Sequence, residues 1–152
     1  MKISLNSIGI IQTPYNDKAP RQPIADADGT FALILNAEYS KALKQLDSFK
    51  YIYVIYFLDK ALWPNELELS KPLKNQQKIG LFASRSPNRP NPIGLSVVKI
   101  KKIEKNVIYI SGIDAFNGTP LLDIKPYIKK LDAKPDANNG WIDEIEGKYF
   151  LK

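Results

Sequence analysis

The stretch KYIYVIYF, residues 50–57, carries the strongest fold signal in the sequence. It is dense in aromatic and β-branched residues, which are enriched in strands because their side chains pack well on a pleated surface. Lys50 and Asp59 flank the run, and charges at such positions discourage aggregation. We therefore predict a central strand over Lys50–Phe57.

Weaker strand signals lie on both sides of this run. Upstream, alternating apolar residues predict strands over 3–11 and 31–35. Downstream, strands are expected over 79–83, 95–103, 107–113 and 121–124, with a hairpin turn near 104–106. One helix is expected over 37–47, after Asn36 as N-cap, because apolar residues recur there at helical spacing.

Many short strands and one short helix predict a mostly β fold, either a barrel or a sandwich. The sequence has no alternation of strands and helices, and it has neither G-x-G-x-x-G nor a phosphate-binding G-x-x-x-x-G-K-[ST] motif. We therefore expect a non-Rossmann fold. The length of 152 residues suits one domain.

No segment predicts membrane insertion or export. The longest apolar run, Tyr51–Leu58, is far too short to span a bilayer. The first residues, Met1-Lys2-Ile3, begin a strand-like pattern rather than a signal peptide. We expect a cytoplasmic protein.

The sequence contains neither cysteine nor histidine. Disulfides, thiol nucleophiles, cysteine-type zinc sites and Ser-His-Asp triads are thereby excluded. A general base would have to be Asp, Glu, Lys or Tyr. Mg²⁺ held by carboxylates alone stays possible, but no paired acidic motif indicates it and we expect no metal. Group transfer from an activated donor fits this composition better than hydrolysis does.

The net charge of +6 favours a polyanionic partner such as nucleic acid, although general solubility accounts for it equally well. Arginine supplies only three of the 22 basic residues, and all three lie in proline-bracketed loops: Arg21 in APRQP, Arg85 and Arg89 in SRSPNRPNPIGLS. A guanidinium fork grips phosphate or carboxylate at two points, and neighbouring prolines limit the entropy lost on binding. The alternative is that these arginines cap carbonyl groups in loops that close the fold.

A third loop, GIDAFNGTPLLDIKPY over 112–127, has the same character. Asp114 and Asp123 offer carboxylates for ribose hydroxyls or an arginine; equally, Asp114 caps the Asn117-Gly118 turn and Asp123 belongs to the polar face of a strand. Nearby aromatic residues are candidates for base stacking or for ordinary packing: Tyr15, Phe116 and Tyr127.

These loops resemble one family. IGIIQTPY with APRQP, then IGLFASRSPNRPNPIGLSVVKI, then GTPLLDIKPY are similar to members of the TrmO (YaeB-like) family, S-adenosylmethionine-dependent tRNA methyltransferases. The resemblance covers about residues 8–127, with an echo at Gly140-Trp141. It implies a single β-barrel domain over 1–152, a homodimer with the cofactor pocket near the subunit interface, and no appended C-terminal domain. The implied reaction methylates N6 of threonylcarbamoyladenosine at position 37, in the anticodon loop of tRNA.

The resemblance also implies site residues. Cofactor contacts are expected from Pro20, Arg21, Gln22, Asp59, Lys60, Arg85, Leu95, Asp114, Ala115, Phe116 and Asn117. From the residue types, we also expect Arg85 and Tyr127 at the reacting groups and RNA phosphates at Arg89, Lys125, Lys129 and Lys130. The alternative for the lysines is an ordinary solvated face. Two positions depart from the family pattern: Asp59-Lys60 replaces a histidine, and Asn117 replaces an aspartate. The remaining alternatives are a methyltransferase for another nucleotide or small molecule, and an RNA-binding barrel without chemistry.

Overall fold

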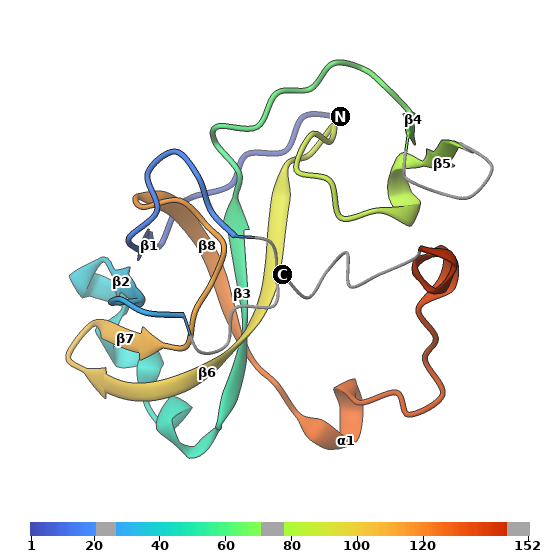
Figure 1. Cartoon of the computed structure of the whole chain (residues 1–152). Helices are drawn as coiled ribbons and strands as arrows, with labels where there is room; N and C mark the ends of the chain where they lie inside the picture. Colours follow the sequence, from blue (N-terminus) through green and yellow to red (C-terminus); the bar gives the residue numbers. More distant parts are fainter. Residues whose placement is uncertain (21–26, 71–77, 146–152) are drawn as a thin grey trace.

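Six antiparallel strands form the body of the protein (Figure 1). The computed structural model describes residues 1–20, 27–70 and 78–145. The strands pair as a closed barrel in the order β1-β2-β7-β6-β3-β8. Their bounds are β1 (Gly9–Gln12), β2 (Ala32–Leu35), β3 (Tyr51–Phe57), β6 (Ile93–Glu104), β7 (Val107–Ile110) and β8 (Thr119–Pro126). The mostly β, non-Rossmann prediction is confirmed.

Strand β3 is central, as KYIYVIYF predicts. It pairs with β6 along its whole length and with β8 on its other side. Ile52, Val54 and Tyr56 are buried, whereas Tyr51 and Phe57 are exposed, so alternate side chains point into the barrel. The pairing with β8 shifts register between Ile55 and Tyr56, because β8 has an extra residue, Leu122, between Leu121 and Asp123.

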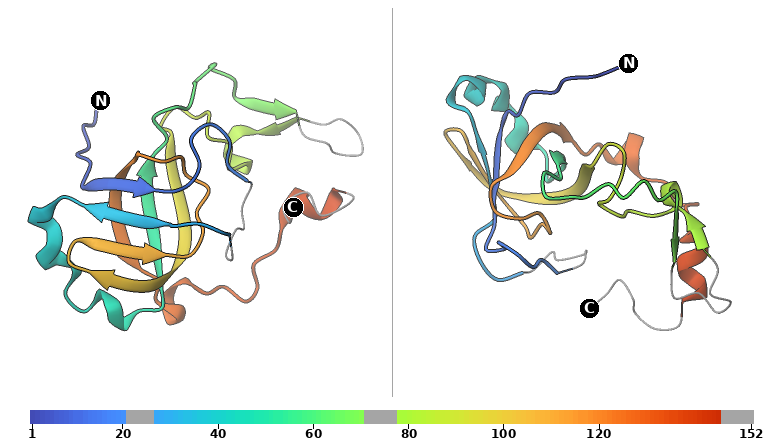
Figure 2. Two further views of the ribbon diagram at one scale, coloured as in Figure 1. Left: turned by 60° about the vertical axis from the view of Figure 1, so that its left-hand side comes forward. Right: turned by 90° about the horizontal axis from the view of Figure 1, so that it is seen from above.

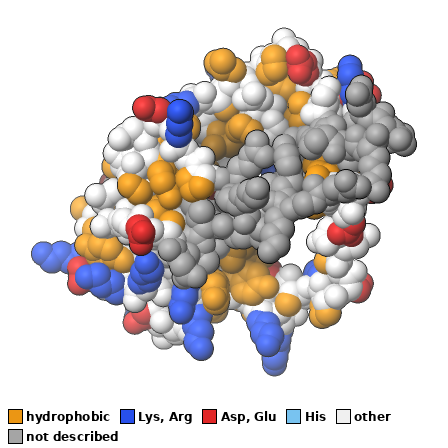
Figure 3. Space-filling view, in the orientation of Figure 1, with side chains coloured by type: hydrophobic (Ala, Val, Ile, Leu, Met, Phe, Trp, Pro, Cys, Tyr) orange, Lys and Arg blue, Asp and Glu red, His pale blue; other side chains and the backbone are white. Residues whose placement is uncertain are grey.

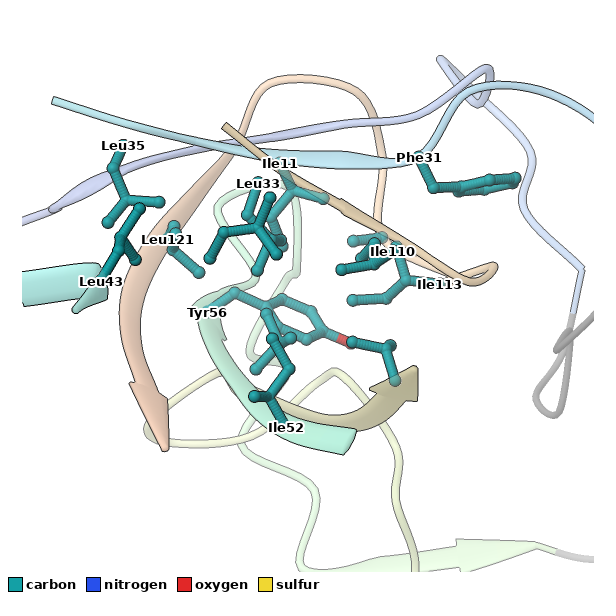
Figure 4. Close-up of a cluster of buried hydrophobic side chains, with 14 residues drawn as sticks. Ile11, Phe31, Leu33, Leu35, Leu43, Ile52, Tyr56, Ile110, Ile113 and Leu121 are labelled. Carbon is teal, nitrogen blue, oxygen red and sulfur yellow. The ribbon is translucent and has the colours of Figure 1, made fainter. Parts of the chain in front are cut away.

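Apolar side chains from every barrel strand fill the interior (Figure 4). Burial of this apolar surface is the main term that offsets the chain entropy lost on folding. Two further side chains in the core, Ile113 and Ala115, come from the loop between β7 and β8. The loop that the sequence singles out is therefore anchored in the core.

The helix expected over 37–47 is not an α-helix. The segment forms two 3₁₀ helices, η1 (Ala37–Leu43) and η2 (Leu46–Ser48), and Asn36 makes no side-chain cap. Gln45 lies between them with φ of 67°, a left-handed conformation that interrupts a continuous α-helix. The only α-helix of the described residues is the short α1 (Lys129–Asp132).

Two strand boundaries also differ from the prediction. The first strand begins at Gly9 rather than Ile3, since the backbone hydrogen bonds to the neighbouring segments start only at Ile8, and Ile3 and Leu5 lie exposed. The strand expected over 79–83 divides into β5 (Lys78–Gly80) and the 3₁₀ helix η3 (Leu81–Ala83), because Leu81 turns inward and is buried.

Two segments extend away from the barrel on the same side (Figure 2). One carries the hairpin of β4 (Glu68–Ser70) and β5. The other follows β8 through α1 to the 3₁₀ helix η4 (Gly140–Glu144). The Trp141 indole Nε1 donates a hydrogen bond of 2.7 Å to the Ala83 carbonyl, so the C-terminal segment is tied to η3. Among the described residues, no helix combines the length and the apolar character needed to cross a membrane.

Candidate functional site

The loop between β7 and β8 is held on both sides of its polar residues. Ile113 and Ala115 are buried, so the intervening Asp114 and the following Phe116 are left half-buried at the rim of the barrel. Gly118 has φ of 82°, a conformation that suits glycine and completes the turn into β8. The tight turn expected at Asn117-Gly118 is present.

This loop docks on the segment that follows β1. The Asn117 amide donates 2.6 Å to the Tyr15 carbonyl, and the Thr13 amide donates 3.3 Å to Asn117 Oδ1. The buried Thr13 hydroxyl donates 2.9 Å to the Ala115 carbonyl. Asn117 acts here through its side-chain oxygen, which an aspartate would also offer, so this departure from the family pattern keeps the acceptor.

The end of β3 reaches the same place. Lys60 Nζ donates 3.0 Å to the Asn16 carbonyl and lies 4.9 Å from the centre of the Phe116 ring. Asp59 is the neighbouring exposed residue. We call the segments 13–16, 59–60 and 114–117 the loop cluster; they meet at one end of the barrel although they are far apart in sequence.

Tyr56 connects the loop cluster to the interior. Its side chain is 4% exposed, and its hydroxyl lies 3.1 Å from Ser96 Oγ and 3.4 Å from Asp114 Oδ1. Burial, and then the Asp114 carboxylate, raise the pKa of Tyr56 to about 12. The hydroxyl therefore stays protonated and remains a donor at physiological pH.

The arginine-rich loop lies between η3 and β6. Arg89 Nη1 donates 2.8 Å to the Ser84 carbonyl, and its guanidinium lies 5.6 Å from the centre of the exposed Phe82 ring. Asn88 Oδ1 accepts from the Leu62 amide. The contact of Arg89 with the Ser84 carbonyl agrees with the alternative that these arginines cap carbonyl groups. The Arg85 side chain is exposed to solvent.

Three of the expected cofactor residues, Pro20, Arg21 and Gln22, are consecutive in the sequence. Arg21 and Gln22 are outside the described residues, so their predicted contacts stay predictions. Pro20, the last described residue before them, is half-buried.

Other predicted residues lie away from the loop cluster within one chain. Leu95 is 55% exposed on the outer face of β6, since its neighbours Gly94 and Ser96 point inward. Tyr127 follows the far end of β8 and packs on Tyr53 with ring centres 5.5 Å apart. Strand β8, labelled in Figure 1, has eight residues and spans roughly 26 Å. Phe116 precedes this strand and Tyr127 follows it, so the two residues lie beyond its opposite ends.

The predicted lysines lie near Tyr127. Lys125 pairs with Asp123 at 2.8 Å, and Asp123 also accepts from the Ile124 amide, which fits the polar-face alternative for Asp123. Lys129 and Lys130 are exposed on α1. All three cations are available at the surface, and Lys125 alone among them has a carboxylate partner among the contacts described.

An apolar strip covers the outer face of β3 and β6. It consists of exposed apolar side chains at outward-facing positions of the two strands, where Phe57 and Ile93 are register partners: Tyr51, Phe57, Ile93, Leu95 and Val97. Each is between 39% and 55% exposed. Figure 3 shows hydrophobic side chains at the surface of the barrel beside the C-terminal segment.

In the described part of the chain, no candidate metal cluster lies at the loop cluster. Within 1–20, 27–70 and 78–145, no three His, Cys, Asp or Glu residues gather as metal ligands. An open hollow lies at the β4–β5 hairpin, and its lining includes Asn65, Glu68 and Lys78 but none of the predicted cofactor residues.

Sequence reasoning missed Tyr56, Ser96 and Thr13. The sequence places each of them in or next to a predicted strand, and the alternation of apolar residues there predicts an ordinary core position. Only Ser96 carries a signal, because a serine at an inward position needs a hydrogen-bond partner. Its partner, 40 residues away, is fixed by the pairing of β3 with β6.

Comparisons with known proteins agree with this fold. Residues 10–133 match the family model of the tRNA-methyltransferase O N-terminal domain. A probable S-adenosyl-L-methionine-binding protein of Pyrococcus abyssi is 36% identical over 95% of this chain and 78% of its own length. The tRNA (adenine(37)-N6)-methyltransferase of Escherichia coli is 32% identical over 86% of this chain and 60% of its own length.

A crystal structure of TrmO from Pseudomonas aeruginosa superposes with a TM-score of 0.75 at 33% identity, over 92% of this chain and 62% of that one. The chain thus spans about three fifths of the E. coli and P. aeruginosa proteins. The match over residues 10–133 covers the barrel and every described segment of the loop cluster. On this evidence the chain belongs to the TrmO family.

Proposed function

We propose that this chain is an S-adenosylmethionine-dependent methyltransferase that methylates N6 of an adenosine in tRNA. The observation that carries the proposal is the loop cluster, in which Lys60 meets Phe116 at the rim of a barrel of this family. Residues 1–152 act as one β-barrel domain. Relatives named tRNA (adenine(37)-N6)-methyltransferase support position 37 as the target.

The chemistry of the loop cluster fits a nucleoside methyl donor. The Asp114 carboxylate suits an amino group or the two hydroxyls of a ribose, and Phe116 offers a flat ring face for a base. When bound, S-adenosylmethionine supplies a methyl group on a sulfonium, whose sulfur takes the bonding electrons as the methyl leaves. The residues of the chain have only to hold donor and target in line, which is catalysis by positioning.

Asp59 and Lys60 extend the donor contacts from the end of β3. Asn117 fixes the turn and Ala115 anchors it, and Pro20, Arg21 and Gln22 are included in the proposal as further donor contacts. The sequence offers Arg21 and Arg85 as guanidinium groups that pair with an anion. In the proposed substrate, threonylcarbamoyladenosine, that anion is the threonyl carboxylate, and Arg85 binds it.

A homodimer completes the site. Leu95 faces outward from β6, and Tyr127 lies at the other end of the barrel from Phe116, so neither meets the loop cluster of its own chain. The apolar strip on β3 and β6 offers the surface on which a second copy packs. Leu95 and Tyr127 of the partner subunit then line the donor pocket.

Surface cations bind the anticodon loop of tRNA. Lys125, Lys129, Lys130 and Arg89 contact phosphates, which fix the register of an RNA without reading its sequence. Arg89 does so while its Nη1 holds the loop at Ser84. The enzyme works in the cytoplasm, where its substrate is made.

The experiment that tests the proposal is methyl transfer to tRNA. Wild-type protein is incubated with S-adenosylmethionine carrying a labelled methyl group and with tRNA that has or lacks the threonylcarbamoyl group. Label is expected in the modified tRNA. Arg85→Ala is expected to reduce transfer at least about tenfold, the loss typical of a charged contact. The exposed Lys41→Ala serves as control.

Three results separate the alternatives. Donor binding without label in any RNA favours a small-molecule methyltransferase. Salt-dependent RNA binding without donor binding leaves an RNA-binding barrel. Equal losses in Arg85→Ala and Lys41→Ala remove Arg85 from the site.

A further inference from the structure

The Tyr56 hydroxyl is the polar group of the barrel core that reaches the loop cluster. The ring lies among Ile52, Ile110 and Ile113 in the apolar interior (Figure 4). The oxygen at its end contacts Ser96 on β6 and Asp114 on the loop between β7 and β8. One side chain of β3 thus joins two other parts of the barrel.

The direction of the hydrogen bonds between Ser96, Tyr56 and Asp114 follows from which of these side chains can donate a proton. An ionised carboxylate only accepts, so the proton of the Tyr56 hydroxyl points to Asp114 Oδ1. The contact of 3.1 Å with Ser96 must then be donated by the serine hydroxyl. The chain runs from Ser96 through Tyr56 to Asp114, and such chains strengthen their members in a medium of low dielectric constant.

Two features of the backbone make room for the tyrosine. Gly94 faces Tyr56 across the β3–β6 pair, and a Cβ there would lie 2.2 Å from Cε2 of the ring. On its other side the pairing with β8 shifts register opposite Ile55 and Tyr56, where β8 has the extra residue Leu122, and bulges of this kind locally change the strand pairing near functional sites. The glycine and the bulge both act at the residue whose hydroxyl meets Asp114.

We propose that Tyr56 is a positioning residue that holds the Asp114 carboxylate in the orientation that binds the methyl donor. The inference rests on the proposed function and adds a residue to it. Tyr56 does not touch the donor; it acts through Asp114, whose carboxylate binds the amino or ribose hydroxyl groups of a sulfonium nucleoside. The substitution Tyr56→Phe keeps the aromatic ring but removes the hydroxyl that orients the Asp114 carboxylate.

Calorimetry with S-adenosylhomocysteine, the product form of the donor, measures the effect without RNA. Tyr56→Phe is expected to raise the dissociation constant about tenfold, as for loss of one hydrogen bond to a charged group. The KM for S-adenosylmethionine rises with it, while kcat at saturating donor stays within about twofold, because binding and not the reacting centre is affected. Tyr109→Phe, on β7 of the same barrel, is the matched control.

A double-mutant cycle asks whether Tyr56 works through Asp114. In an Asp114→Asn background, Tyr56→Phe should cost less than half of its effect in the wild type, because the charged acceptor is already lost. Ser96→Ala leaves the Tyr56 proton free to reach Asp114 and should change affinity less than Tyr56→Phe does. Full additivity in the cycle overturns the proposal.

A spectroscopic measurement stands independently of donor binding. The ¹³C resonance of the Asp114 carboxyl carbon, assigned through Asp114→Asn, should move in Tyr56→Phe and stay in place in Tyr109→Phe. If wild type binds no donor, the proposed function fails, and an unmoved resonance then overturns the Tyr56–Asp114 coupling separately. If wild type binds donor and Tyr56→Phe binds it equally well, only the positioning role fails.

Discussion

At the scale of single residues, a few polar side chains inside an apolar barrel organise the candidate site. Thr13 holds the loop between β7 and β8 through the Ala115 carbonyl, and Tyr56 approaches Asp114 from the core. The described side chains leave no buried polar atom without a hydrogen-bond partner. Such satisfied networks fix one arrangement, because an unpaired polar group in the interior costs about 1–3 kcal/mol.

Replacement of Gly94 by alanine should destabilise the barrel. The new Cβ would meet the Tyr56 ring at 2.2 Å, and the ring is enclosed by the core, so overpacking should cost about 1–3 kcal/mol of unfolding free energy. Gly80→Ala is the control, since no atom lies within 4 Å of its Cβ position. Urea unfolding of both variants measures the difference, and equal midpoints would refute the close contact.

The raised pKa of Tyr56 predicts a loss of stability in alkali. Burial raises it from 10.0 to about 12, so the folded protein keeps a proton that the unfolded chain has released. The stabilisation is complete below pH 10 and falls between pH 10 and 12, by at most about 2–3 kcal/mol. The comparison is with Tyr56→Phe, whose unfolding free energy should fall less over that range. Parallel curves for the two proteins would contradict the shift.

Some of the site residues follow from sequence and others do not. The unusual arginine and proline content marks the loop at 84–92, and Asn117-Gly118 marks a turn, because both depend on local chemistry. Tyr56 and Ser96 depend on the pairing of strands 40 residues apart, which no local pattern encodes. Arg89 donates through Nη1 to the Ser84 and Ser86 carbonyls of its own loop, and its contact with an RNA phosphate stays a prediction.

At the scale of elements, strands are predicted better than helices. The run Lys50–Phe57 and the hairpin of β6 and β7 are found because β-branched and aromatic residues fill them, and the turn between them has Lys105 at φ of 54°. The helix over 37–47 has the right apolar spacing, and Leu43 is buried as expected. The apolar spacing does not reveal that Gln45 adopts a left-handed conformation, which ends the first helical segment before the second begins. The segment forms two 3₁₀ helices instead of one α-helix.

The link between η4 and η3 should hold the arginine-rich loop in place. Trp141→Phe keeps an aromatic ring but removes the donor to the Ala83 carbonyl, so the backbone after Leu81 should open more often. Hydrogen exchange of the peptide over 81–92 is expected to quicken severalfold. Trp63→Phe, which alters the other tryptophan, serves as control. Unchanged exchange in Trp141→Phe would show that the link does not restrain the loop.

At the scale of the whole molecule, the account depends on a second copy of the chain. The barrel buries one apolar face of each strand, yet the outer faces of β3 and β6 also carry large apolar side chains. Such a strip is commonly covered by a partner surface. The closed barrel itself has no free strand edge, so we expect two barrels to associate through side chains on the outer face.

A charge in the apolar strip should separate the subunits. Leu95→Asp places a carboxylate where the proposed interface is apolar, and an unpaired charge there is strongly unfavourable. Sedimentation should change from twice the chain mass of 17.2 kDa to that of one chain, and donor affinity should fall with it. Ile10→Asp, on the outer face of β1, is the control. A wild-type monomer would contradict the proposed dimer.

The most direct test of the account is titration of wild-type protein with S-adenosylmethionine in a calorimeter, together with Asp114→Ala. We expect one donor bound for each chain, and at least about tenfold weaker binding in Asp114→Ala, as for loss of a charged contact. Absence of binding to the wild type, or equal affinity in Asp114→Ala, would contradict the claim that the loop cluster holds the methyl donor.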